Sequence, residues 1–560
     1  MTIFCMLAAL IYGVVAFSAQ WEASYNPTYQ IDTSLGALPL YSLFSALRGF
    51  VAYLVSLGFT LVVGYWAAKS PRAEKVILPF LDVMQSIPVL GFLPGLVLGL
   101  VAIFPRTNVG LELASILLIF TGQVWNMTFA YYSSLKSVPT DLKEAASVIT
   151  LSPMQRLRLL ELPYSAMNLT WNSVMSMAGG WFFLTVCEAF TLGDKAYRLP
   201  GIGAYMAVAI DQGNSEAIVG GIVGMTAVIF LFDFLLWRPA LVWAHRFRLE
   251  EGENEVKLDE PLIQLLIRDS IVLRMVKALN FRPHRTRIRA TVSSWHLPQP
   301  RIFQGFAIKL WQRQLLFFSL GIGVAMLSGY GTVRLVKTMS VVSLDEWLSI
   351  LRDTGFTLAR VLVSVFIGTL WAVPVGIWVV QNPRRLRIAQ PIIQLLASFP
   401  APMLYPLAIA VFLWAHINFE VSAMLLMLLG VQWYILFNVL AGALRIPTEL
   451  RLGMRLMGTS NWTQWRYLFI PSVLPSLVTG WVTAAGGAWN ASIVSEIVEY
   501  KGRTLESHGL GAQISKAAAH GDFPRLAACL FVMVLFVVAF NRTVWARLYR
   551  VTQTRFRMDL

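Results

Sequence analysis

The sequence predicts an all-α polytopic membrane protein built from two parallel repeats of six helices, about twelve transmembrane helices in all. Three observations indicate this class. Of the 560 residues, 57% are apolar and 13% are charged, and the mean hydropathy is +0.63. The chain contains twelve apolar runs in two sets of six, and landmarks recur between the sets at a nearly constant spacing. This composition argues against a large soluble core.

The apolar runs have about the length that a spanning helix needs, close to 20 residues. The first set lies near 3–19, 47–68, 82–104, 111–133, 168–191 and 216–244. The second set lies near 314–330, 357–380, 394–416, 420–443, 476–498 and 524–547. Proline pairs in the third and ninth runs, Pro88 with Pro94 and Pro400 with Pro406, predict kinks there.

Basic residues follow every second run, on one predicted side of the membrane. They include Lys69, Lys143, Arg246, Arg385 and Arg451. The opposite loops of the first half carry Glu22, Asp32 and a single Arg106. The positive-inside rule therefore places both termini in the cytoplasm. Because these loops account for the net charge of +15, the charge is no indication of nucleic-acid binding.

A shift of 308 residues aligns the two halves between Trp125 and Trp545. The aligned pairs include Trp125 and Trp433, Trp181 and Trp489, Glu188 and Glu496, and Gly201 and Gly509. Upstream the shift is 312, which aligns Arg48 with Arg360. A tandem duplication explains these matches. We place the first repeat at 1–245 and the second at 306–560; an even number of spans gives both the same orientation.

A connector at 246–305 separates the repeats and is expected in the cytoplasm. It opens acidic, with LEEGENEVKLDE, and closes basic, with RPHRTRIR. Its segment 262–279 carries apolar residues at helical spacing. Two interpretations stay open, an amphipathic helix on the membrane surface and a tether that packs on a neighbour.

A polar segment follows the fourth run of each half, at 140–163 and at 448–471. The first contains helix formers around Ala145 and a break at Ser152 and Pro153. Two short helices outside the bilayer predict a docking element for another protein, because small residues permit close approach and charges resist burial in lipid. The alternative is a plain connecting loop, but the segment is long for one and recurs in the other half.

These segments resemble the EAA loop of permease subunits of binding-protein-dependent ABC importers. That pattern is Glu-Ala-Ala, a Gly six residues after the Glu, and a later Leu-Pro. In the first half the fitting residues are Glu144, Ala145, Ala146, Leu162 and Pro163, with Thr150 at the Gly position. In the second half they are Gly458, Ile470 and Pro471, with Leu452, Gly453 and Met454 in place of Glu-Ala-Ala. The resemblance implies that all of these residues couple to an ATPase, unequally in the two halves.

Further motifs resemble the nitrate/sulfonate/taurine/bicarbonate branch of these permeases. They are GGWFFLTVCEAF with GIGAYM in the first half and GGAWNASIVSEIV with GLGAQI in the second. The resemblance implies a type I ABC importer permease fold in the inner membrane of a bacterium. It also implies two ATPase subunits, the same or different, and a solute-binding protein as partners, besides membrane lipid.

The chain contains no Gly-Lys pair and therefore no P-loop, whose Lys and backbone amides cradle phosphates. We accordingly expect a transport subunit rather than an enzyme, without a cofactor of its own, and ATP hydrolysis by partner subunits. The six His and three Cys show no ligand spacing, so no metal is expected. A different class, a major-facilitator-like secondary transporter, should carry a Gly-x-x-x-Asp-Arg type pattern after its second span. The loops AKSPRAEK and QNPRRLR lack it.

Glu188 and Glu496 lie at matching positions near the predicted outer ends of two spans, each seven residues after Trp181 or Trp489. A carboxylate at that depth marks a pathway or a partner. One interpretation places these four residues along the translocation pathway. The other pairs the carboxylates with loop cations, which are Lys195 or Arg198 and Lys501 or Arg503.

The predicted solute is a small anion such as nitrate, bicarbonate or an organosulfonate, on the resemblance to that branch. Unpaired carboxylates in a shared cavity would repel an anion, so this prediction requires both glutamates to be neutralised or turned away. The alternative solutes are ferric iron and thiamine, which pathway acids suit better.

Overall fold

The computed structural model describes residues 15–21, 23, 29–193, 195–247, 323, 326 and 329–555. The chain divides into one unit over Met1–Asn254 and Leu344–Leu560 and another over Glu255–Ser343. In the second unit, the described residues 329–339 are helical. Nearly all of the predicted connector 246–305 lies outside the described residues, so its two interpretations stay predictions.

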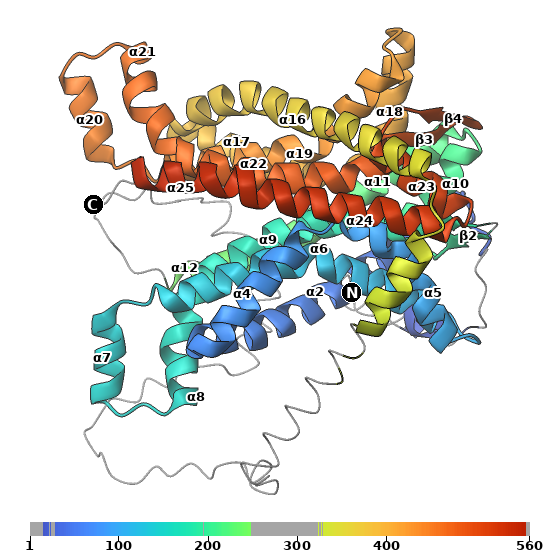
Figure 1. Cartoon of the computed structure of the whole chain (residues 1–560). Helices are drawn as coiled ribbons and strands as arrows, with labels where there is room; N and C mark the ends of the chain where they lie inside the picture. Colours follow the sequence, from blue (N-terminus) through green and yellow to red (C-terminus); the bar gives the residue numbers. More distant parts are fainter. Residues whose placement is uncertain are drawn as a thin grey trace, which may run out of the picture. The chain divides into compact units, whose positions relative to one another are not determined.

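The first half is a succession of long helices with short breaks (Figure 1). It begins with α2 (Leu38–Phe59), the π-helix η1 (Thr60–Gly64), α3 (Tyr65–Lys69), α4 (Pro71–Ser86), the 3-10 helix η2 (Val89–Phe92), α5 (Leu93–Ile103) and α6 (Val109–Lys136). It continues with α7 (Thr140–Val148), α8 (Pro153–Arg156), η3 (Leu157–Glu161), α9 (Leu162–Cys187), β1 (Ala189–Leu192), β2 (Lys195–Arg198), α10 (Ile202–Asp211), α11 (Ser215–Phe232), η4 (Asp233–Trp237) and α12 (Arg238–His245).

The second half repeats this order, with one long helix in place of α2, η1 and α3 and with one helix in place of η2 and α5. Its elements are α16 (Leu344–Val380), α17 (Pro383–Ser398), α18 (Ala401–Trp414), α19 (Phe419–Leu444), α20 (Thr448–Leu456), α21 (Asn461–Gln464), η6 (Trp465–Phe469) and α22 (Ile470–Ser495), followed by β3 (Ile497–Tyr500), β4 (Arg503–Glu506), α23 (Leu510–Ala519), α24 (Phe523–Phe540), η7 (Asn541–Trp545) and α25 (Ala546–Arg555). The predicted duplication is therefore visible element by element.

Seven helices in the described part of the chain are long and apolar enough to cross a membrane, or eight if the bent pair α17 and α18 counts as one span. The predicted runs at 3–19 and 314–330 lie largely outside the described residues. The run at 82–104 is divided between short elements. The run at 168–191 lies in α9, which carries polar side chains such as Asn168 and Asn172. The polytopic α-helical class is confirmed, and the number twelve stays a prediction.

The predicted proline breaks are present in both halves. Helix α4 ends before Pro88 and helix α17 before Pro400, and the residue before each proline is extended, at ψ 127° for Ile87 and 128° for Phe399. Proline disfavours the helical conformation in the residue before it, which accounts for both breaks. At the second break α17 and α18 meet at 90°.

Two antiparallel hairpins, β1 with β2 and β3 with β4, are the strands of the described residues and were not predicted. In each half the central helix packs on two others, α6 on α2 and α9, and α19 on α16 and α22. The halves also contact each other, since α9 packs on α17 and α18 while α22 packs on η2. The polar helices α7, α8, α20 and α21 lie at the opposite end of the long helices from the strands (Figure 1).

Candidate functional site

The predicted docking segments form matching pairs of short helices, α7 with α8 and α20 with α21. In the first pair, Glu144 and Ala145 are exposed and Ala146 is buried. In the second, Leu452 is exposed, while Gly453 and Met454 are half-buried. A serine caps the second helix of each pair, because Ser152 Oγ accepts from the Gln155 amide and Ser460 Oγ from the Thr463 amide.

A left-handed residue makes the turn between the two helices of each pair. Gly458 has φ 66° and Thr150, at the matching position, has φ 52°. This region suits glycine and strains a β-branched residue. The turn thus favours the glycine of the family pattern. In the first half Thr150 adopts the same left-handed conformation with backbone strain.

Two exposed apolar residues precede each of these turns. Val148 and Ile149 are 81% and 66% exposed in the first half, and Leu456 and Met457 are each 79% exposed in the second. The shift of 308 residues relates the two pairs. Adjacent exposed apolar side chains on polar helices are typical of a contact surface, since no described residue covers them. Sequence reasoning located the segments but not these four residues.

The remaining docking residues begin the long helices that follow. Leu162 and Pro163 are the first residues of α9, and Ile470 and Pro471 are the first of α22. Each proline follows a π-helix, η3 or η6, with no break in the helical conformation, and it removes one amide donor at that junction. The structure thus joins each docking segment directly to a long helix.

Glu188 lies in a buried network at the end of α9. Its carboxylate forms an ion pair with Arg48, accepts from Ser45 Oγ at 2.6 Å and accepts from the Gly203 amide at 2.7 Å. Arg48 also holds Glu112, with Nε 2.8 Å from Oε2 and Nη2 2.8 Å from Oε1. Arg48, Glu112 and Glu188 are all buried, so this bidentate arrangement joins α2, α6 and α9.

Glu496 lies in the matching network of the second half. It accepts from Arg360 Nη1 at 2.9 Å and from Thr357 Oγ1 at 2.8 Å. Arg360 also forms an ion pair with Glu420. This copy is more open, because Glu420 is 37% exposed and its Oε1 lies 2.7 Å from Nδ1 of the exposed His508.

The prediction that loop cations pair with the glutamates is wrong. Arg198 pairs with Asp211, and the partners of Glu188 and Glu496 are Arg48 and Arg360. Spacing along the chain favours the nearby loop cations, whereas the partners in the structure lie about 140 residues upstream. A signal was available, since Arg48 and Arg360 match in the repeat alignment.

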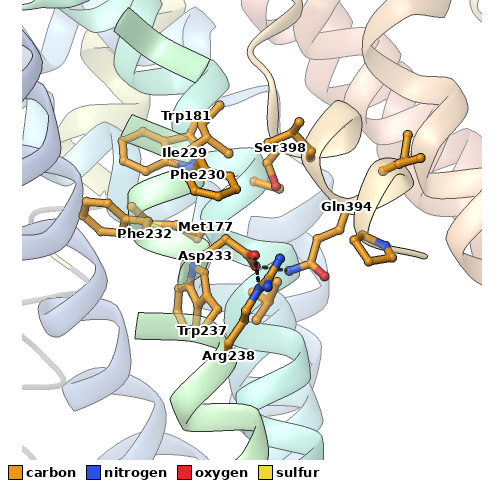
Figure 2. A pocket seen from close by; sticks show the side chains of 15 residues that line it. Met177, Trp181, Ile229, Phe230, Phe232, Asp233, Trp237, Arg238, Gln394 and Ser398 are labelled. Atoms are coloured by element: carbon orange, nitrogen blue, oxygen red, sulfur yellow. Dashed lines mark hydrogen bonds and ion pairs between the residues drawn. The ribbon is translucent and has the colours of Figure 1, made fainter. Parts of the chain in front are cut away.

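Trp181 and Trp489, predicted to line a pathway, are both buried. Trp181 packs edge-on against Phe232, with the ring centroids 5.2 Å apart, and Trp489 packs on Phe536. Trp181 also lines a cavity of about 180 Å³ between α9, α11 and α17, together with Phe230 and Trp237 (Figure 2). The roles of the two tryptophans and two glutamates in translocation stay predictions.

The same cavity contains a polar link between the halves. Asp233 Oδ2 accepts from Arg238 Nε at 2.9 Å, and Oδ1 accepts from Gln394 Nε2 of the other half at 2.9 Å (Figure 2). A second link joins the halves elsewhere, where Asn490 Oδ1 accepts from the Val89 amide at 2.7 Å. The site therefore combines an interface between two halves with a predicted docking helix pair on each.

Comparison with known proteins gives the family. The chain matches the family described as "Binding-protein-dependent transport system inner membrane component" over residues 60–237 and again over 364–557. The two matches each cover one half. They confirm a fused, duplicated permease with the type I ABC importer permease fold.

Similar curated proteins match over roughly one half of the chain. The taurine transport system permease protein TauC of Escherichia coli is 24% identical over 241 residues, which are 40% of this chain and 83% of TauC. ProW of the same organism, a glycine betaine/proline betaine transport system permease protein, is 26% identical over 41% of this chain and 61% of ProW.

A third relative supports the predicted branch. The putative aliphatic sulfonates transport permease protein SsuC of Bacillus subtilis is 25% identical over 36% of this chain and 70% of SsuC. Together with TauC, it confirms the resemblance to the sulfonate and taurine permeases. The chain belongs to the family of binding-protein-dependent transport system inner membrane components and is a membrane-embedded permease component of an ABC importer.

Proposed function

We propose that this chain supplies both halves of the membrane pathway of an ATP-driven importer for a small oxyanion, and that separate ATPase subunits drive it. The observation that carries this proposal is the repeated docking surface, defined as Val148 and Ile149 in the first half and Leu456 and Met457 in the second. One ATPase subunit contacts each pair. ATP is hydrolysed by these partners, because the chain has no P-loop.

The proposed mechanism follows from the connection between docking helices and long helices. A solute-binding protein delivers the solute at the outer face, and closure of the two ATPase subunits moves α7 and α20. Because these helix pairs lead directly into α9 and α22, their motion reaches the contacts of α9 with α17 and of α22 with η2. Those contacts lie between the halves, where alternating access requires a change.

The proposed location is the inner membrane of a bacterium, with both termini and the docking helices in the cytoplasm. Single cysteines at Asp32 and Glu144, both exposed, test this orientation in a chain without Cys5, Cys187 and Cys529. An impermeant thiol reagent on intact cells should label position 32 and not position 144. Labelling of position 144 alone would mean that the chain has the opposite orientation.

Buried pairing of the glutamates supports an anionic solute. Glu188 and Glu496 are fully buried and paired with arginine, so neither carboxylate faces a solute in this conformation. The objection that unpaired pathway acids would repel an anion therefore loses its basis. Taurine and sulfonate permeases among the relatives support an oxyanion as well.

A zwitterion with a quaternary ammonium group is the second candidate solute. The observation that favours it is the cavity beside Asp233, whose walls include Trp181, Trp237 and Phe230. Aromatic faces attract such cations, and the relative ProW is a betaine permease.

An uptake assay separates these solutes. The chain is reconstituted in vesicles with its ATPase subunits and binding protein, and labelled nitrate, bicarbonate, taurine, glycine betaine, thiamine and ferric iron are compared. We expect ATP-dependent uptake of an oxyanion. Uptake of betaine alone would favour the zwitterion, and uptake of thiamine or iron alone would make the anion proposal wrong.

A further inference from the structure

A second cavity, of about 230 Å³, lies inside the docking element of the second half. Its walls come from α20, α21, η6 and the residue that follows α16. The polar side chains that line it belong to Arg451, Arg455, Gln381, Asn461 and Gln464. We call it the guanidinium pocket. It does not touch the docking surface or the interface between the halves described above.

The guanidinium pocket has positive charge and no acid of its own. No aspartate or glutamate is among the described residues that line it, and no ion pair of the described residues includes Arg451 or Arg455. Arg451 donates through Nη2 to the Ala443 carbonyl, but its buried Nε has no hydrogen-bond partner in the described part of the chain. A buried donor without an acceptor is costly, so an acceptor oxygen beside this Nε would be stabilising.

The electrostatics of Arg451 agree with this geometry. Burial lowers the pKa of its guanidinium, and the positive charge of Arg455 lowers that pKa further. Both causes disfavour the charged form. A negative group between the two arginines would oppose both.

The first half shows how this place is neutralised when an acid is present. There Glu161 is buried and forms ion pairs with Lys69 and with Arg156, whose Nε lies 3.1 Å away. The matching residues in the second half are Phe469 for Glu161, Gln381 for Lys69 and Gln464 for Arg156. In the second half the acid and both of its cations are thus replaced by uncharged residues, while Arg451 and Arg455 stand where the first half has Lys143 and Ser147.

We propose that the guanidinium pocket binds a small oxyanion of the phosphate or sulfate type, which counters the charge of its two arginines. Arg451 and Arg455 contact its oxygens, because a guanidinium fork matches an oxyanion better than a point charge does. Gln464 uses one amide hydrogen for the Thr459 carbonyl at 3.1 Å and carries a second for the ligand. Asn461 and Gln381 offer further amide donors.

The position of the pocket gives the bound anion a regulatory role that rests on the proposed function. The anion would tie α20 and α21 to the end of α16, as Glu161 ties η3 to Lys69 in the first half. Coupling through the second docking element would then depend on the anion, whereas coupling through the first would not. Binding itself is independent of transport and is measured first.

Equilibrium dialysis of the purified full-length chain with labelled phosphate and with labelled sulfate tests the site. Arg455→Gln, an exposed position, should weaken binding about tenfold or more, as expected for the loss of a charged hydrogen bond. Phe469→Glu should weaken it similarly by restoring the internal acid. Gln464→Glu serves the same purpose if Phe469→Glu does not fold. Lys143→Gln, at the position matching Arg451, is the control and should bind like the parent chain.

The oxyanion could be free in the cytoplasm or could be the phosphate of a lipid headgroup. Dialysis is therefore repeated in nanodiscs of phosphatidylcholine and of phosphatidylglycerol. If the lipid phosphate fills the pocket, phosphatidylglycerol should be retained by the parent chain and lost from Arg455→Gln, and it should reduce phosphate binding. The proposal is overturned if the parent chain binds neither phosphate, sulfate nor lipid. It is also overturned if Arg455→Gln binds them as the parent chain does. Either outcome holds even if transport of an oxyanion is demonstrated.

Discussion

The two halves can be compared at two places, the buried arginine network and the docking helices. The networks repeat residue by residue: Arg48 and Arg360 each hold two glutamates, and Ser45 or Thr357 supplies a hydroxyl. The docking helices repeat in backbone but not in charge, because Glu161 is replaced by Phe469. The duplicated halves therefore kept the contacts that hold three long helices together and changed a buried charge beside the docking helices.

The largest expected effect sharpens the comparison of the networks. Arg48→Met should destabilise the chain by about 3–5 kcal/mol, because it leaves two fully buried carboxylates without a cation. Arg360→Met should cost less, since Glu420 is partly exposed and contacts His508. Thermal unfolding in detergent measures both, with the exposed Arg384→Met as the control. Equal losses would mean that the openness of the second network is energetically irrelevant.

The second-largest expected effect concerns the docking surface of each half. Replacing Val148 and Ile149 by Asp, or Leu456 and Met457 by Asp, should weaken ATPase binding at least about tenfold, because each buried apolar side chain contributes about 1.5–3 kcal/mol. Both double variants should unfold like the parent chain, since all four residues are exposed. Co-purification of the ATPase measures the loss, and Asp141→Asn on the same helix is the control. Full ATPase binding by both double variants would mean that these four residues are not the docking surface.

A smaller effect concerns the turn inside each docking element. Gly458→Thr should destabilise the second element by about 1–2 kcal/mol, because it imposes the left-handed strain that Thr150 already carries. Thr150→Gly should relieve about 1 kcal/mol after the entropy of glycine is counted. Gly453→Ala, which meets no neighbour in α20, is the control and should be neutral or stabilising. Opposite shifts in unfolding temperature for the two turn variants are expected, and shifts of the same sign would contradict the strain.

The smallest effect belongs to the first half alone. Lys136 Nζ and Tyr132 Oη bond Glu74, and these hydrogen bonds lower the pKa of its carboxyl. The matching residue in the second half is Leu386. Because the pKa of the Glu74 carboxyl is lower in the folded than in the unfolded chain, this group stabilises the fold at pH values above its unfolded pKa of about 4.3. The stabilisation is lost as the pH falls through the folded pKa. Glu74→Gln should therefore unfold at a slightly lower temperature than the parent chain at pH 7. This difference in unfolding temperature should vanish in acid. A difference that persists in acid would exclude this linkage.

The sequence predicted the parts of this structure that depend on local patterns. The repeat alignment matched Thr150 with Gly458 and Arg48 with Arg360, and the prolines gave the breaks at Pro88 and Pro400. It failed for Glu188, because a charge pair across 140 residues is fixed by how α2 packs on α6 and α9, and spacing along the chain cannot specify that. The hairpins were missed for a similar reason, since β1 and β2 are four residues each and lie next to long apolar runs.

The buried network has a consequence for biogenesis. Arg48, Glu112 and Glu188 emerge from the ribosome in that order, and all three come from the first half. Each half therefore carries the countercharges that its own helices need in the bilayer, and neither has to wait for the other before its charged side chains are neutralised. Fusion of the two halves fixes their stoichiometry at one to one.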